Sequence, residues 1–140
     1  MKSLNNLGKY KNYGLLFIRI GLGILFIYHG FPKLSGGPHK WERLGTAMGF
    51  LGIHFLPIVW GFLSAITETV GGLLVLLGFG FRPVCIFLVI NLIVAAIFTY
   101  AVSGNFGDAT HAIEDAIIFA GLFLIGPGVY SIDEKFIARQ

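Results

Sequence analysis

The sequence predicts an all-α integral membrane protein: a four-helix bundle with a short interfacial helix in the first loop and a short amphipathic helix at the C-terminus. Of its 140 residues, 56% are hydrophobic and only 12% are charged, whereas a soluble domain carries about 25% charged residues. Four apolar runs, each near the length of about 20 residues that a bilayer span requires, are separated by glycine, proline and polar residues. We therefore expect one membrane domain over residues 1–140.

The expected spans are residues 14–31, 55–80, 83–102 and 109–125. Lysines precede the first run, as in a secretion signal, but Arg19 interrupts its apolar stretch and no small-residue cleavage site follows. We therefore interpret the first run as a retained helix.

The connecting segments also carry helix signals. The second half of the first loop has apolar residues at helical spacing, which predicts a helix lying in the interface with Trp41 at the level of the lipid headgroups. Gly126-Pro127-Gly128 ends the fourth run, and Ser131 to Glu134 has the spacing of a capping box, which predicts the terminal helix.

Charge and cysteine content exclude several classes of function. The net charge is +3, but the basic residues lie at the ends of the expected helices and form no stripe with aromatic residues, so we expect no nucleic-acid partner. The single cysteine, Cys85, excludes an intrachain disulfide and a CxxC redox centre. Six Lys and Arg residues flank the spans on the side of the termini and three on the other side, which predicts a cytoplasmic-membrane protein with both termini inside.

Charged side chains within the spans are candidate functional residues, because each costs at least ~2.5–3.5 kcal/mol at the centre of a bilayer. Glu68 lies in the middle of the second run with small residues on its helix face, so we expect it to face the bundle interior. We predict a contact between Arg19 and Glu68, direct or through water or a ligand. The alternatives are a neutral pair that only holds two helices in register, and an Arg19 side chain that extends to the inner surface.

A second polar group is expected in the outer half of the bundle, where His29 lies near the end of the first run, Lys33 follows that run, and the fourth run begins. There His111 lies three residues before Glu114 and four before Asp115, so the three share a helix flank. These three are weak metal-ligand candidates, and His29 with His111 is the one pair suited to haem. The chain has no second copy of the motif, and hydrogen bonding at the interface is the simpler interpretation.

The order of short motifs resembles a known family. The motifs are Arg19 to Gly23, His29 to Leu34, Glu68 followed by Gly71-Gly72, then Arg82, Glu114, Gly126-Pro127-Gly128 and Ser131-Ile132-Asp133. Together they resemble the DoxX family of small four-helix membrane proteins. The family's terminal element is usually Gly-Pro-Gly, a spacer and Ser-Leu-Asp, and here Ile132 replaces the leucine.

The resemblance implies a four-helix bundle in the cytoplasmic membrane of a prokaryote. It implies a link to quinone chemistry, since the family is named after a subunit of an archaeal terminal quinol oxidase, related proteins belong to thiosulfate:quinone oxidoreductases, and some bacterial members work with redox enzymes in oxidative-stress defence. The positions that match as site residues are Arg19, His29, Lys33, Glu68, Arg82 and Glu114.

These observations lead to three hypotheses. The first is a membrane subunit of a quinone-linked oxidoreductase, with quinone as cofactor and a soluble or membrane protein as electron donor, because the sequence shows no redox centre of its own. Its quinone or proton site would comprise Arg19, His29, Lys33, Glu68, Asn91 and Glu114, which supply hydrogen-bond donors and titratable groups. The second is a small-molecule or proton carrier, which at this length requires a homo-oligomer. The third is a scaffold in which the buried charges only fix packing.

Overall fold

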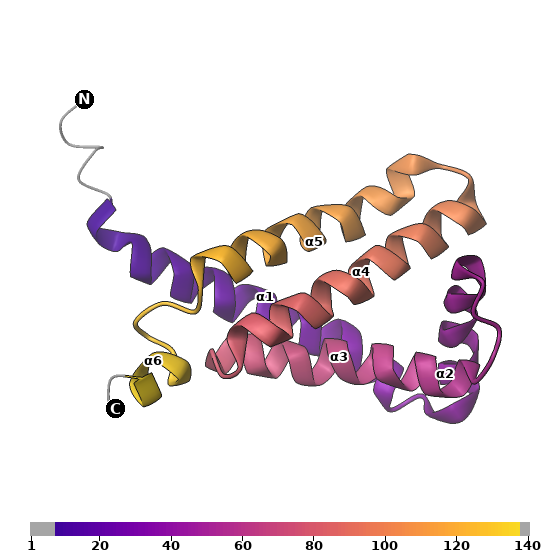
Figure 1. Cartoon of the computed structure of the whole chain (residues 1–140), viewed down its shortest axis with the longest axis horizontal. Helices are drawn as coiled ribbons and strands as arrows, with labels where there is room; N and C mark the ends of the chain where they lie inside the picture. The colour runs from indigo at the N-terminus through magenta and orange to yellow at the C-terminus, as the bar shows by residue number, and fades with distance from the viewer. Residues whose placement is uncertain (1–7, 138–140) are drawn as a thin grey trace.

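The computed structural model describes residues 8–137, and this part of the chain is helical. Four long helices carry the fold, with shorter helical segments in the first loop and at the end of the chain (Figure 1). The elements are α1 (Lys11–Leu34), α2 (Gly37–Gly45), the 3-10 helix η2 (Thr46–Leu51), α3 (Pro57–Leu77), α4 (Phe81–Ser103), α5 (Phe106–Ile125) and α6 (Ile132–Ile137). The predicted all-α class and both predicted short helices are confirmed.

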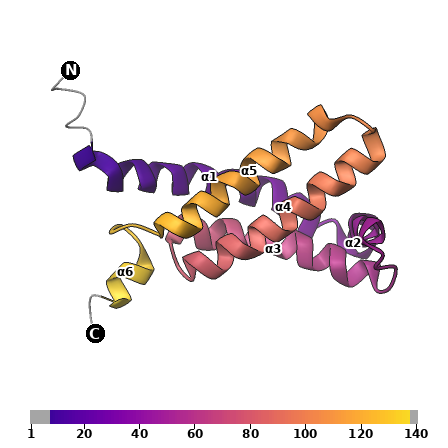
Figure 2. The ribbon, with the colours of Figure 1, turned by 45° about the horizontal axis from the view of Figure 1, so that its top comes forward.

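The long helices run side by side, so that the molecule has two ends. α1 packs along α3 and α4 packs along α5, with α3 and α4 joining the two pairs. The start of α1 lies at the same end as α6, while α2 and η2 lie across the opposite end (Figures 1 and 2). We call these the terminal end and the loop end.

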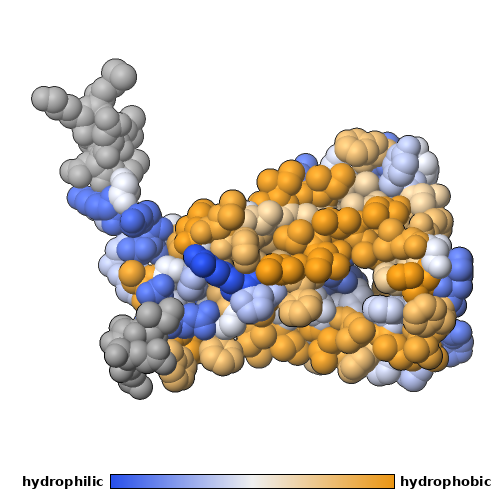
Figure 3. All heavy atoms as spheres, in the orientation of Figure 1, coloured by the Kyte–Doolittle hydropathy of each residue, from blue (hydrophilic) through white to orange (hydrophobic). Residues whose placement is uncertain are grey.

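The outer surface is apolar over most of the length of the helices. Hydrophobic side chains cover the middle of the face in Figure 3, and hydrophilic ones gather towards the two ends. Phe17 is 79% exposed and Leu124 is 75% exposed. Such side chains are stable in contact with lipid and costly in contact with water, so this surface is that of an integral membrane protein.

Three helices of the described segment, α1 with the turn before it, α3 and α4, are long and apolar enough to span a membrane. α5 has 20 residues and packs along α4, but it carries Asp108, Glu114 and Asp115. Its role as the fourth span therefore stays a prediction.

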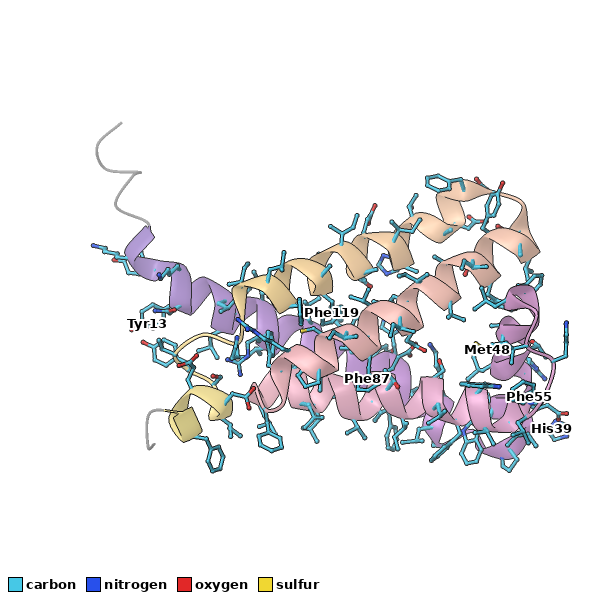
Figure 4. All side chains as sticks on the ribbon, viewed as in Figure 1. Tyr13, His39, Met48, Phe55, Phe87 and Phe119 are labelled. Carbon is cyan, nitrogen blue, oxygen red and sulfur yellow. The ribbon has the colours of Figure 1, made fainter. Side chains whose placement is uncertain are left out.

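The interior between the long helices is a small hydrophobic core. Val75, Phe81, Cys85, Leu88 and Phe119 are fully buried. The rings of Phe26 and Phe119 meet edge to face at 4.9 Å, which joins α1 to α5. Figure 4 shows Phe119 within the bundle, whereas Phe87 on α4 is 61% exposed.

Two expected boundaries are wrong in ways that matter for the site. α1 does not end at Phe31 but continues through Pro32 to Leu34. Pro32 has no N–H to donate, and its ring crowds the carbonyl one turn back, but only Lys33 and Leu34 follow it before the helix ends. Lys33 therefore belongs to the last turn of α1 rather than to a loop. α3 ends at Leu77, three residues before the expected boundary, because Gly78 adopts a left-handed conformation with φ 65°.

The loop end is held together by a close approach between backbones. Gly61 on α3 lies directly against the carbonyl of Trp41 on α2, and a β-carbon there would overlap that carbonyl. The Trp41 ring also packs edge to face on Phe62 at 4.9 Å. Trp41 therefore packs against the bundle, and not only at headgroup level.

We expect Gly61→Ala to lower the free energy of unfolding by about 1–3 kcal/mol, as overpacking of a tight site does. Thermal unfolding of the purified protein in detergent measures this. The matched control is Gly21→Ala, where a β-carbon meets nothing within 4 Å and the gain in helix propensity is up to ~1 kcal/mol. Equal melting temperatures for the two variants would contradict the close α2–α3 contact.

Candidate functional site

Glu68 in the middle of α3 is the centre of a polar triad inside the bundle. The ammonium group of Lys33 donates to both of its carboxylate oxygens, at 2.8 Å to Oε1 and 2.6 Å to Oε2. The amide Nδ2 of Asn91 donates to Oε1 at 3.1 Å. The three side chains come from α1, α3 and α4, so the triad connects three helices.

Small residues explain why Lys33 reaches Glu68. Gly30, one turn before Lys33, lies against Thr69, and a β-carbon at Gly30 would come within 2.6 Å of the Thr69 backbone nitrogen. Gly23 makes the same kind of approach to the carbonyl of Gly72. The two backbones therefore pack closely along a glycine face. The indole Nε1 of Trp41 donates to the Lys33 carbonyl at 3.1 Å, which stabilises the end of α1.

The electrostatics of the triad favour a charged pair. Burying a lone carboxylate in an apolar interior is costly, and a hydrogen-bonded counter-ion offsets that cost. The side chain of Glu68 is 7% exposed, whereas that of Lys33 is 31% exposed. Lys33 is thus both the counter-ion of Glu68 and its connection to the surface. Chemically, the arrangement can hold a proton and present a cationic donor to a bound molecule.

The predicted direct contact between Arg19 and Glu68 is wrong. The Arg19 side chain donates Nε to the Val75 carbonyl at 3.1 Å and Nη2 to the Leu76 carbonyl at 3.0 Å. Its Nη1 donates to the carbonyls of Pro127 at 2.8 Å and Tyr130 at 3.3 Å. Arg19 is 1% exposed, so it does not extend to the surface either.

Arg19 instead joins the end of α3 to the segment that follows α5. The last four carbonyls of a helix have no partner within the helix and carry partial negative charge. Those of Val75 and Leu76 are among them, since α3 ends at Leu77. A guanidinium group, with five donors in a planar fork, satisfies carbonyls on both segments at once. The role of Arg19 in this structure is therefore to hold the terminal end together.

Asp133 is a residue whose role sequence reasoning missed. Its two carboxylate oxygens accept from the backbone nitrogens of Gly80 and Phe81, both at 2.9 Å, and its own nitrogen donates to the Gly78 carbonyl at 3.0 Å. It thereby caps the start of α4 from a distant part of the chain. In the sequence, the indication that Asp133 has a role was its place in the Ser131-Ile132-Asp133 motif. The capping contact of Ser131 itself is present, since its Oγ accepts from the Glu134 nitrogen at 3.2 Å.

The other predicted site residues lie outside the triad. His29, His111 and Glu114 are exposed and lie near enough to Asp115 to interact with it through their charges. They form a second polar group where α1 faces α5. Within residues 8–137, no three His, Cys, Asp or Glu side chains converge as a metal site would require. The structure thus unites Lys33, Glu68 and Asn91, and leaves the remaining candidates elsewhere.

Comparison with known proteins covers nearly the whole chain. The sequence profile of the DoxX family matches residues 14–101, which contain the triad and Arg19. An uncharacterized protein of Haemophilus influenzae is 30% identical over 97% of this chain and 100% of its own length. The Escherichia coli inner membrane protein YqjF is 33% identical (89% of this chain, 93% of the relative), and inner membrane protein YphA is 27% identical (86% and 89%). No solved structure gives a significant match.

The triad predicts non-additive effects on stability. Glu68→Gln leaves the Lys33 ammonium without its counter-ion, and loss of one partner of a buried pair costs about 3–5 kcal/mol, less where a partner is partly exposed as here. We expect Glu68→Gln to destabilise the protein by ~1–3 kcal/mol, and the double variant Lys33→Met/Glu68→Gln to recover at least half of that loss. Thermal unfolding in detergent measures the cycle.

The control for this cycle is Arg43→Met, which removes an exposed arginine of α2 and should change the free energy of unfolding by less than ~0.5 kcal/mol. Losses that simply add in the double variant would show that Lys33 and Glu68 do not act as a pair.

Proposed function

This chain belongs to the DoxX family of integral membrane proteins, and we propose that it is the membrane subunit of a quinone-linked oxidoreductase or redox-stress complex. The observation that supports this function is the Lys33–Glu68–Asn91 triad, an ion pair held among three helices of a membrane protein. Ionisable residues in such positions mark proton or ligand pathways more often than not.

The chemistry of a quinone headgroup suits this triad. The headgroup is apolar except for two carbonyl oxygens, so it partitions into the bilayer and needs a hydrogen-bond donor and a proton source. The partly exposed Lys33 ammonium donates a hydrogen bond to one carbonyl oxygen and passes a proton to it on reduction. The Glu68 carboxylate, its counter-ion, then favours uptake of the next proton by the lysine from the aqueous surface. Reduction of a quinone to a quinol consumes two electrons and two protons. In this proposal the electrons come from a soluble or membrane partner protein, and the triad carries protons.

The proposed function predicts saturable quinone binding next to Trp41. The chain has two tryptophans, so Trp60→Phe leaves Trp41, whose indole contacts the Lys33 carbonyl, as the single fluorescent reporter. We expect a short-chain ubiquinone or menaquinone analogue to quench this fluorescence with saturation. Lys33→Met and Glu68→Gln, each in the Trp60→Phe background, should weaken the binding at least tenfold, because the donor or its charge partner is lost.

Arg43→Met in the same background, which removes an exposed arginine of α2, is the matched control and should bind like its parent. Quenching that does not saturate, or that is unchanged in both triad variants, would overturn the quinone site. If those variants only lower the melting temperature, the triad is a scaffold element. Proton flux in liposomes without any redox partner, abolished by Glu68→Gln, would instead favour a carrier.

We also propose that the protein lies in the cytoplasmic membrane, a location that its inner-membrane relatives support. We propose in addition that both termini face the cytoplasm. Because Lys33 pairs with Glu68 inside the bundle, Lys40 and Arg43 are the basic residues left to flank the spans at the loop end. The excess of positive charge at the terminal end is thus larger than a count by sequence gives. Positive charge favours the cytoplasmic side.

Labelling of introduced cysteines tests this orientation. Cys85 is fully buried, so the parent protein should react little with a membrane-impermeant maleimide. In intact spheroplasts we expect the His39→Cys variant of α2 to be labelled and the Lys135→Cys variant of α6 to be protected. Permeabilised membranes serve as the control, in which both variants should react. The reverse pattern in spheroplasts would show that the termini face outward.

A further inference from the structure

A cavity of about 640 Å³ lies at the terminal end, between the start of α4, the end of α5 and α6. Its lining includes Arg82, Glu134 and the apolar side chains of Phe79, Ile125 and Phe136. α4 has 23 residues, or about 34 Å of helix at ~1.5 Å per residue, against a hydrocarbon core of about 30 Å. Its first turn, and with it Arg82, therefore lies at the boundary between hydrocarbon and headgroups.

The cavity is lined by one basic residue, Arg82, and two acidic residues, Asp133 and Glu134. Arg82 and Glu134 do not pair with each other. Within the described segment neither Arg82 nor Glu134 has an oppositely charged group within 4.0 Å, since the ion pair found there joins Lys33 and Glu68. Asp133 also lines the cavity, but its oxygens accept from Gly80 and Phe81. Arg82 and Glu134 thus remain available for a ligand that carries both an anion and a cation.

The Arg82 guanidinium lies beside Gly126, where the chain turns after α5. A β-carbon at Gly126 would stand 3.5 Å from Nη2 and 3.8 Å from Nε of Arg82, in ordinary contact, so the glycine leaves additional space beside these two nitrogens. The same glycine has φ 88°, a conformation that other residues rarely adopt. A guanidinium binds a phosphate through two parallel hydrogen bonds from N–H groups in its plane, and Nε with Nη2 is one such pair.

The walls of the cavity continue into the lipid-facing surface. Ile125 is 70% exposed, Phe136 is 59% exposed and Phe79 is 48% exposed. A ligand here would therefore have a zwitterionic head and an apolar body. A headgroup with net negative charge would be repelled by Glu134 and Asp133, and a trimethylammonium group has no N–H to donate to a carboxylate.

We propose that this cavity binds phosphatidylethanolamine, with the lipid phosphate on Arg82 and its ammonium group on Glu134. The acyl chains then lie along the apolar surface of α5. This site is at the opposite end of the bundle from α2, and the inference does not depend on the proposed function.

The test is a titration of delipidated protein in detergent, followed by native mass spectrometry. The probes are dioleoyl phosphatidylethanolamine, the phosphatidylglycerol and phosphatidylcholine with the same acyl chains, and soluble glycerophosphoethanolamine. We expect phosphatidylethanolamine to bind at least tenfold more tightly than the other two lipids. Arg82→Gln should lose at least tenfold in affinity for it, and Glu134→Gln should shift the preference towards phosphatidylglycerol.

Arg43→Gln, which removes an exposed arginine of α2 at the loop end, is the matched control and should bind like the parent. Melting temperatures within ~2 °C of the parent show that the variants are folded, as expected for substitutions at the surface. Tighter binding of phosphatidylglycerol by the parent, or no effect of either cavity variant, would overturn the proposal. If glycerophosphoethanolamine bound as tightly as phosphatidylethanolamine, the ligand would be the free headgroup compound, and the proposal of a lipid ligand would be overturned.

Discussion

A charge that is carried into the interior of a membrane protein must find its partner on another helix, and this constraint organises the whole molecule. Glu68 and Arg19 satisfy it in two different ways. Glu68 is neutralised by an ammonium ion from α1 and an amide from α4. Among residues 8–137, Arg19 has no carboxylate within ion-pair distance, and it relies on carbonyl groups at the end of α3 and after α5. Each side chain therefore joins elements that are distant in the sequence.

The glycines of α1 and α3 make these contacts possible. In lipid no hydrophobic force drives helices together, so close packing of small residues and polar contacts must do so. Gly23 and Gly30 face backbone atoms of α3 at distances that exclude a side chain. The glycine face and the polar residues therefore depend on each other: the glycines bring the backbones together, and the ion pair selects one register.

The two ends of the molecule differ in a way that bears on function. Towards the loop end, the polar triad is partly open through Lys33, and Trp41 and α2 pack beside it. At the terminal end, Arg19 and Asp133 are committed to backbone groups, and a separate cavity holds Arg82 and Glu134. A group that is already satisfied by the backbone has a structural role, whereas a titratable pair with a partly exposed member can also exchange protons. This difference favours the triad over Arg19 as the proposed site of proton chemistry.

The sequence by itself determined the helical class, the membrane environment and the residues of interest, because composition and the cost of buried charge act on each segment independently. Lys33, Glu68 and Asn91 were all among the candidates. Their pairing was decided only by the tertiary structure. Arg19 and Lys33 lie 14 residues apart on α1, about 21 Å along the helix, so one carboxylate can reach only one of them. Whether Arg19 or Lys33 reaches the Glu68 carboxylate depends on the register of α1 against α3 and on the continuation of α1 through Pro32. Both follow from contacts between distant residues, which no local pattern encodes.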